Sequence, residues 1–197
     1  MNILNQKKKK FEKGLSLIES AMVLALAATV TAGVMFYYQS ASDSNKSQSA
    51  ISLVMSATSA INGLYIGQAG YSGLNASVLI NSSAIPDTYK DKTGNNISNP
   101  FGGKLIPAAA QQGANGSFGY ALTLDGLPKS ACISLATLNL GTSAKGYGIG
   151  VTSPESNNSF NGTLDAKGKA KASPITPAEA AKACTDENGN TVTYFMK

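Results

Sequence analysis

Glu19 is the only charged residue in an apolar stretch that runs from Leu15 to Tyr38. A carboxylate inside an apolar helix costs about 2–3 kcal/mol on insertion scales, so such a residue usually has a partner. One interpretation places Glu19 at a membrane interface, within reach of lipid headgroups. The other has its carboxylate neutralise a cation in an assembled state. In either case the chemistry is charge pairing.

Cys132 and Cys184 are the only cysteines of the chain. In an extracytoplasmic protein an even number of cysteines favours a disulfide over two buried thiols. In the chain-entropy model, closing this loop would stabilise the fold by roughly 4 kcal/mol. A zinc site is a poorer interpretation, because two cysteines without histidine cannot complete a tetrahedral shell.

The composition argues against most kinds of active site. All 16 basic residues are lysines, and the chain has no His, Arg or Trp. It therefore has no His general base, no Ser-His-Asp triad and no guanidinium clamp for phosphate. An enzyme would need a site built only from Ser, Lys, Asp and Glu. We expect no enzymatic activity, no cofactor and no bound metal.

The positive charge is concentrated at the N-terminus. Five of the 16 lysines precede Gly14, together with Glu12, which leaves eleven lysines and ten acidic residues in the rest of the chain. A nearly neutral body argues against a nucleic-acid partner. A second lysine run, at 167–171, is either a patch for an anionic partner or a solvated loop. Its Gly and Ala spacers favour the solvated loop.

The apolar stretch has the length of a membrane span. As a helix, Leu15–Tyr38 would be about 36 Å long, enough for a hydrocarbon core of about 30 Å. A cleaved secretory signal fits less well, because no small-x-small cleavage site stands out near its end. We expect Lys7–Lys13 on the cytoplasmic side, the rest of the chain outside, and Tyr37 and Tyr38 at the interface.

Hydrophobic spacing predicts the element that carries Glu19. Apolar residues recur at steps of three and four from Ala50 to Tyr65, so one helix is expected from about Ser16 to about Ile66. The polar stretch 39–49 either stays helical or bends. Glycines at 67, 70 and 73 end the helix.

The rest of the chain is predicted to form short elements. We expect a long connection over 67–117 with local structure near 76–79, then a strand at 118–124 that ends at Asp125-Gly126. A helix over 129–140, a strand over 147–151 and a loop over 153–173 follow. A capped helix over 176–184 and, after a turn at Asn188-Gly189, a strand over 191–197 complete the chain. The sum is an α+β fold, with one long helix packed on an antiparallel sheet.

The N-terminal residues resemble the prepilin signature of type IV pilins. The lysine-rich leader, Gly14, a hydrophobic residue at 15, Glu19 and about twenty apolar residues follow in the order found in that family. The resemblance implies cleavage by a prepilin peptidase between Gly14 and Leu15, N-methylation of Leu15, and an assembly role for Glu19. Leu at position 15, instead of Phe, points to the type IVb branch.

Assembly is consistent with the physical properties of this stretch. Cleavage removes the leader lysines and creates a free amine, which the Glu19 carboxylate can neutralise in its own or an adjacent subunit. An unpaired carboxylate in a low-dielectric core costs several kcal/mol, so this pairing enforces register. The alternative is an ordinary single-span anchor. Close helix approach is permitted by small residues, namely Ala21, Ala25, Ala27, Ala28, Ala32 and Gly33.

The resemblance also implies a fold and a division of the chain. The type IV pilin fold has a long N-terminal α-helix packed on an antiparallel β-sheet, with a Cys132–Cys184 disulfide that closes a C-terminal region. The expected parts are a removed leader (1–14), a transmembrane and filament-core helix (15–38), an amphipathic helix (39–66) and an extracytoplasmic globular domain (67–197).

The implied function is that of a major structural subunit of a type IVb pilus. The helix is buried in surface filaments that serve adherence, autoaggregation and bundling. The implied partners are further copies of the chain, the prepilin peptidase, the pilus assembly machinery, the inner membrane before assembly and a host-cell surface receptor. The implied location is the inner membrane, then the extracellular pilus. Alternatives are a type II secretion pseudopilin, a membrane-anchored enzyme and a receptor-binding adhesin.

Overall fold

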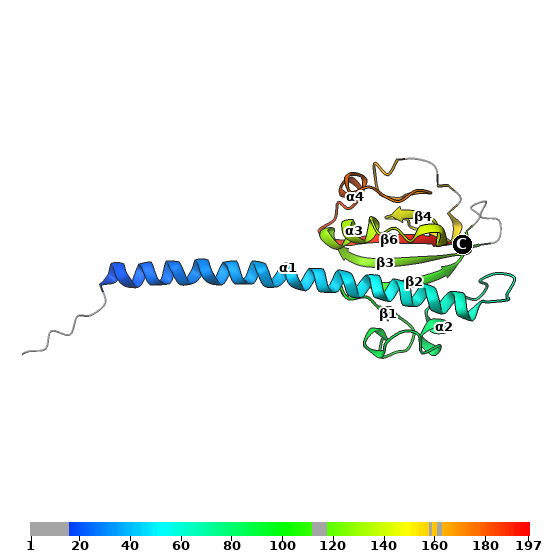
Figure 1. Ribbon diagram of the computed structural model, residues 1–197, viewed down its shortest axis with the longest axis horizontal. Coiled ribbons are helices and arrows are strands. Elements are labelled where there is room, and N and C mark those ends of the chain that lie inside the picture. The colour runs from blue at the N-terminus through cyan, green and yellow to red at the C-terminus, as the bar shows by residue number, and fades with distance from the viewer. Residues whose placement is uncertain (1–15, 112–117, 158, 161–162) are drawn as a thin grey trace, which may run out of the picture. The chain divides into compact units, whose positions relative to one another are not determined.

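The long N-terminal helix is present in the computed structural model, which describes residues 16–111, 118–157, 159–160 and 163–197. The chain divides into two compact units, Met1–Ser42 and Asp43–Lys197. The helix α1 (Leu17–Leu64) contributes to both (Figure 1). The predicted helix is confirmed, and the polar stretch 39–49 is helical throughout. That stretch contains neither Pro nor Gly, so nothing in it breaks the backbone hydrogen bonds.

The second unit is an α+β domain, as predicted. Its described strands form one six-stranded sheet in the order β1-β2-β3-β6-β4-β5, and every pairing is antiparallel. The last strand of the chain, β6, therefore lies inside the sheet between β3 and β4 (Figure 1). In chain order the strands are β1 (Ile97–Ser98), β2 (Lys104–Ala109), β3 (Tyr120–Pro128), β4 (Ala144–Ile149), β5 (Lys169–Lys171) and β6 (Asn188–Met196).

Short helices connect the strands. The α-helices are α2 (Ala76–Asn81), α3 (Lys129–Ala136) and α4 (Pro177–Ala183), and the 3-10 turns are η1 (Asp87–Tyr89), η2 (Gly141–Ser143) and η3 (Pro154–Ser156). The capping box predicted at the start of α4 is confirmed, with Thr176 and Glu179 bonded to each other's backbone N–H groups.

The main core lies between the second half of α1 and one face of the sheet. Alternation along β3 and β6 directs Leu122, Leu124, Val192 and Tyr194 into this core. The helix contributes residues at three- and four-residue spacing, which are Ala50, Leu53, Val54, Ala57 and Ile61.

A smaller apolar cluster covers part of the opposite face of the sheet. The ring of Phe195 on β6 lies edge-on to the rings of Phe118 and Phe160, with centroids 5.1 and 5.0 Å away. Gly146 and Gly148 leave room for this layer on β4: a Cβ atom on Gly148 would lie 2.7 Å from a methyl carbon of Val151. Glycine is therefore required where the covering loop lies directly on the strand.

The prediction of an irregular connection over 67–117 was wrong in part, because β2 lies within it. Its sequence, Lys104–Ala109, carries Pro107 and two alanines, and Ile106 is its one β-branched residue, so its strand propensity is weak. Proline is tolerated at the edge of a sheet, where its missing N–H is not needed. Among the described residues, β1 pairs only with Lys104 and Leu105, so the remainder of β2 is such an edge.

The predicted end of the next strand at Asp125-Gly126 was also wrong. The strand β3 continues to Pro128, with a shift in its pairing to β6 between Leu124 and Leu127. Gly126 has a φ of 64°, so the Asp-Gly pair forms a bulge within the ladder. Asp125-Gly126 does have a turn-like conformation, but the pairing of the flanking residues with β6 keeps the chain in the sheet.

Several other boundaries differ from the predictions. The helix expected over 129–140 ends at Ala136, and the strand expected over 147–151 is β4, which begins at Ala144. Asn188-Gly189, predicted as a turn, begins β6. The predicted loop 153–173 contains β5, whose Ala170 pairs with Gly148. Such short edge strands depend on a neighbouring strand and leave little periodicity in the sequence.

Candidate functional site

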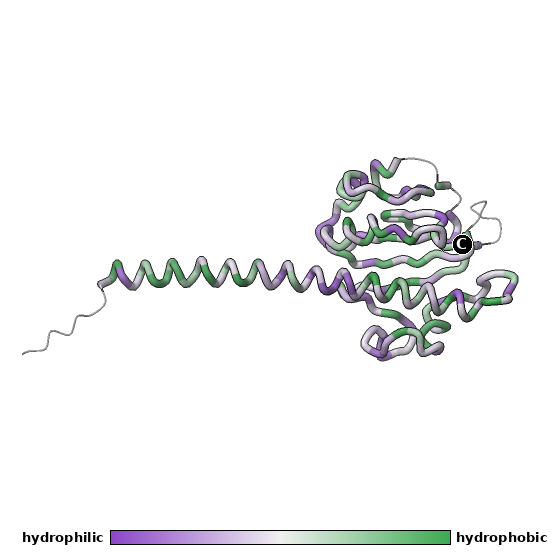
Figure 2. Tube along the Cα trace, in the orientation of Figure 1, coloured by the Kyte–Doolittle hydropathy of each residue, from purple (hydrophilic) through white to green (hydrophobic). Residues whose placement is uncertain are grey.

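The apolar half of α1 has no packing partner within its own unit. Every described residue from Ser16 to Tyr38 is exposed, and Figure 2 shows the hydrophobic run along this segment. Even the least exposed large apolar side chains here, such as Val23, keep about three fifths of their surface accessible (61%). The helix is long and apolar enough to cross a membrane by length and composition. This surface must be buried in lipid or against other helices.

Three hydroxyl groups of this segment, those of Ser20, Thr29 and Thr31, are satisfied inside the helix. Ser20 Oγ donates to the carbonyl of Leu17 at 2.9 Å. Thr29 Oγ1 and Thr31 Oγ1 donate to carbonyls of the preceding turn at 2.9 and 2.8 Å. These three hydroxyls can therefore enter an apolar phase without the cost of an unpaired polar group.

Glu19 lies in the first turn of α1 and is exposed. Its Oε2 accepts a hydrogen bond of 2.9 Å from the backbone N–H of Ser16. This bond is one half of a capping box, and the carboxylate also faces the positive end of the helix dipole. The Ser-x-x-Glu spacing at 16–19 could have indicated this local role, which the sequence analysis missed. The predicted cleavage and methylation positions, Gly14 and Leu15, lie outside the described residues.

Small side chains share one face of the same segment. Ala21, Ala25, Ala28 and Ala32 recur at steps of four, three and four, which places them on one side of a helix. A Cβ atom on Gly33 would meet nothing within 4 Å. A second helix can therefore approach this face closely.

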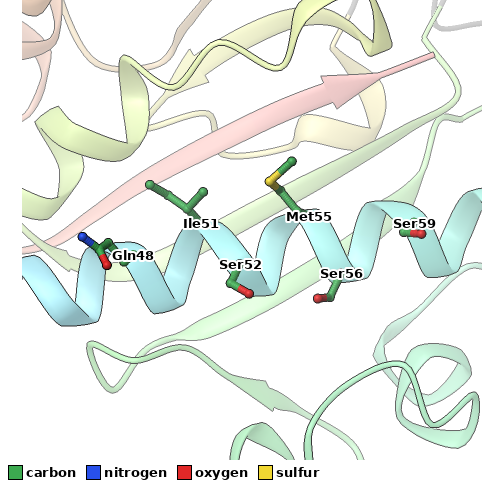
Figure 3. Close-up of a pocket in the computed structure, with 6 residues that line it drawn as sticks. All are labelled: Gln48, Ile51, Ser52, Met55, Ser56 and Ser59. Atoms are coloured by element: carbon green, nitrogen blue, oxygen red, sulfur yellow. The ribbon is translucent and has the colours of Figure 1, made fainter.

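In its second half, α1 has an uncharged side that lies at the surface of the globular unit. Gln48, Ile51, Ser52, Met55, Ser56 and Ser59 line a shallow hollow of about 650 Å³ on the helix (Figure 3). Figure 3 shows Ile51 and Met55 on one side of the helix and Ser52 and Ser56 on the other. This face carries no charged side chain, so another neutral surface can pack on it without desolvating an ion.

The disulfide between Cys132 and Cys184 is present. It joins α3 to the C-terminal end of α4, with the two Cα atoms 6.0 Å apart and both residues fully buried. The helix α3 is fixed to β6 by the hydroxyl of Tyr194, which donates to the carbonyl of Leu135 at 2.7 Å. Burial of this hydroxyl raises the pKa of Tyr194. The bridge thus closes the region that contains β4, β5 and α4.

The lysine run 167–171 is predicted as a solvated loop, but each lysine has an acidic partner. Lys167 pairs with Asp186, Lys169 with Asp165, and Lys171 with Glu179. Among the described residues the run therefore leaves no cluster of free cations for an anionic partner, and only the Lys171–Glu179 pair is largely buried. Within the residues that the structure describes, no group of three or more His, Cys, Asp or Glu side chains is placed to hold a metal ion.

Two solved structures share this architecture. The crystal structure of a type IV b pilin from Salmonella typhi superimposes with a TM-score of 0.56, covers 75% of this chain and 97% of its own, and is 20% identical. That of TcpA, a type IV pilin from Vibrio cholerae El Tor, has a TM-score of 0.50, covers 76% and 98%, and is 17% identical. The long helix, the antiparallel sheet and the disulfide-closed region define the fold of a type IV pilin, as predicted.

The sequence comparisons identify the family. Residues 39–197 match the family model described as Bundlin. Two Escherichia coli proteins, from O111:H- and from O127:H6 (strain E2348/69 / EPEC), are each described as "Major structural subunit of bundle-forming pilus". Each is 67% identical over 190 residues, 96% of this chain and 96% of the relative. The chain belongs to the bundlin family. These matches confirm the resemblance to pilins and narrow it to bundlin.

Proposed function

We propose that this chain is the major structural subunit of a type IVb, bundle-forming pilus. The observation that carries the proposal is the first half of α1, an apolar helix that is exposed on all sides and whose Ser20, Thr29 and Thr31 hydroxyls bond to its own carbonyls. The 67% identity to two pilus subunits over 96% of the chain supports it and favours a major pilin over a type II secretion pseudopilin. Membership of a family of structural subunits also supports a protein without enzymatic activity.

Assembly follows from the properties of this helix. A prepilin peptidase removes residues 1–14 and methylates the amine of Leu15. The apolar side chains of 15–38 are held in the inner membrane until the assembly machinery transfers them into a growing filament. Burial of each large apolar side chain there contributes about 1.5–3 kcal/mol. Helices from many copies replace the lipid, and the small-residue face lets them pack closely.

Glu19 sets the register of this packing. In the single chain its carboxylate is exposed, and among the described residues it accepts the Ser16 N–H alone. In the filament core an uncompensated carboxylate is costly, so it pairs with the N-terminal amine of an adjacent subunit. The filament then lies outside the cell, where its surface loops mediate adherence to a host-cell receptor, autoaggregation and bundling.

The test is the intact mass and N-terminal sequence of the protein in filaments sheared from its native cells, before and after reduction. We expect a chain that begins at Leu15 with one added methyl group, and a mass two hydrogens lower before reduction. A chain that begins at Met1, or beyond Tyr38, would overturn processing by a prepilin peptidase. Low abundance without long fibres would instead indicate a pseudopilin.

A further inference from the structure

The sheet face opposite α1 is covered over only part of its area. The cluster around Phe195 covers the part near β4 and β5. Beside it lies an open hollow of about 500 Å³, lined by residues of β2, β3 and β6 and by the segment from Gly150 to Glu155. These side chains alternate with the core-facing residues of the same strands, so they belong to the outer face.

The hollow combines an apolar floor with two carboxylates. Ile106, Ala108 and Val151 supply aliphatic surface, and Ile106 is 43% exposed. The hydroxyl of Thr123 is already hydrogen-bonded to that of Thr193 at 3.0 Å. Asp125 and Glu155 supply negative charge, and no lysine of the described residues lines the hollow. Within the described part of the chain neither carboxylate forms an ion pair.

Hydrogen bonds fix the positions of Asp125 and Glu155, which carry the two carboxylates. The backbone N–H of Gln111 donates to the carbonyl of Glu155 at 2.9 Å, which ties η3 to the end of β2. The buried amide of Asn99 donates to the carbonyl of Asp125 at 2.8 Å. The backbone N–H of Lys104 donates to Oδ1 of Asp125. The hollow is therefore formed before any ligand binds. Oδ2 of Asp125 and the carboxylate of Glu155 remain available to bind a ligand.

An aliphatic trough with carboxylates in its walls fits an alkylammonium group, because the stem packs on the floor and the ammonium meets the carboxylates. This chain supplies such groups only as lysines, since it has no arginine. Lys92, Lys129 and Lys182 are exposed and belong to none of the described ion pairs. A second copy of the chain therefore carries a matching group.

We propose that this hollow docks a lysine side chain of a second copy of this chain in a neighbouring filament, and that repetition of this contact holds filaments side by side. The inference rests on the proposed function. The face lies opposite the second half of α1, which packs on the other side of the sheet, so that helix does not cover it. Each contact is weak and screened by salt, but a filament repeats it many times.

The test couples carboxylates to amines with a zero-length carbodiimide. Filaments are prepared separately from cells grown on ¹⁴N and ¹⁵N, dispersed, mixed and allowed to form bundles before coupling. We expect peptides that join Glu155 of one isotope to a lysine of the other, and none of these links in Glu155→Gln. Bundles of the same variant should disperse at about half the salt concentration that wild-type bundles require. The reason is that one of the two carboxylates is lost at each contact.

Glu187→Gln is the matched control, because it removes the same charge from an exposed residue outside the hollow. It should leave bundling unchanged. Glu155 links that never join the two isotopes, or bundles of Glu155→Gln as salt-resistant as wild type, would overturn the inference while the filament function stands. Coupling of Glu155 only to an added free amine would overturn it as well. Absence of filaments in the wild type would overturn the proposed function instead.

Discussion

The ammonium of Lys171 on β5 lies 2.9 Å from both carboxylate oxygens of Glu179 on α4. Only 14% and 16% of the two side chains are exposed. The same carboxylate accepts hydrogen bonds of 2.9 Å from the backbone N–H and the hydroxyl of Thr176. One glutamate thus caps α4 and joins it to the edge strand of the sheet, within the region that the disulfide closes.

This pair makes the stability of the domain depend on pH in the acid range. Hydrogen bonding to Lys171, and then to Thr176, lowers the pKa of Glu179 from 4.5 to about 2. A lowered pKa contributes stability that is present above the unfolded value and is lost as the pH falls toward the folded value. We expect the free energy of unfolding to fall between pH 4.5 and about 2, and Glu179→Gln to reduce this dependence. Urea unfolding in mild detergent, followed by circular dichroism over a pH series, measures it.

Lys171→Met provides the companion variant, because it removes the largest cause of the lowered pKa and keeps an aliphatic stem. An acid profile of Lys171→Met identical to that of the wild type would show that the pair is not responsible.

The disulfide should contribute much of the stability of the C-terminal region. Cys132 and Cys184 are 52 residues apart, for which the chain-entropy model gives about 4 kcal/mol. We expect the double variant Cys132→Ser with Cys184→Ser to lose about that much unfolding free energy. Reduction of the wild type with dithiothreitol serves as an independent check on the substitutions. A loss below about 1 kcal/mol in both experiments would contradict the prediction.

Gly148 should not tolerate a side chain. A Cβ atom there would lie 2.7 Å from Val151 and 3.2 Å from the ring of Phe195. Overpacking of this kind typically costs about 1–3 kcal/mol, so we expect Gly148→Ala to lower the unfolding free energy by about that amount. Gly70→Ala is the matched control, because a Cβ atom on Gly70 would meet nothing within 4 Å. Equal midpoints in urea for the two variants would refute this packing argument.

Substitution of Glu19 should abolish assembly and leave the globular unit folded. We expect Glu19→Ala to enter the membrane at wild-type levels and to form few or no filaments, because the N-terminal amine of the neighbour then lacks its partner. Electron microscopy of sheared filaments and immunoblots of membrane fractions measure the two effects. Ser20→Ala removes a hydroxyl that bonds to the Leu17 carbonyl of its own helix, and this variant should assemble normally. Filaments of Glu19→Ala in wild-type number and at wild-type rate would rule out the pairing mechanism.

The elements predicted well from sequence are those that short-range spacing determines. The helix α1 follows from three- and four-residue periodicity and from the absence of Pro and Gly over 39–49. The helix α4 follows from Thr176, Pro177 and Glu179, because a capping box acts within one turn. The pairing of Cys132 with Cys184 follows because the chain has no other cysteine. The apolar surface of α1 and the carboxylate of Glu19, on which the proposed function is based, can likewise be predicted from the sequence.

The sequence by itself thus determined the long helix, the fold class and the family resemblance. Only the tertiary structure decided that β2 and β5 are strands, that Asp125-Gly126 is a bulge, and that Lys171 meets Glu179. The physical reason is that each of these features depends on a partner brought close by the sheet. The hollow beside Asp125 and Glu155 is of the same kind: its walls lie far apart in the chain and become neighbours only when β3 and the segment after β4 fold together.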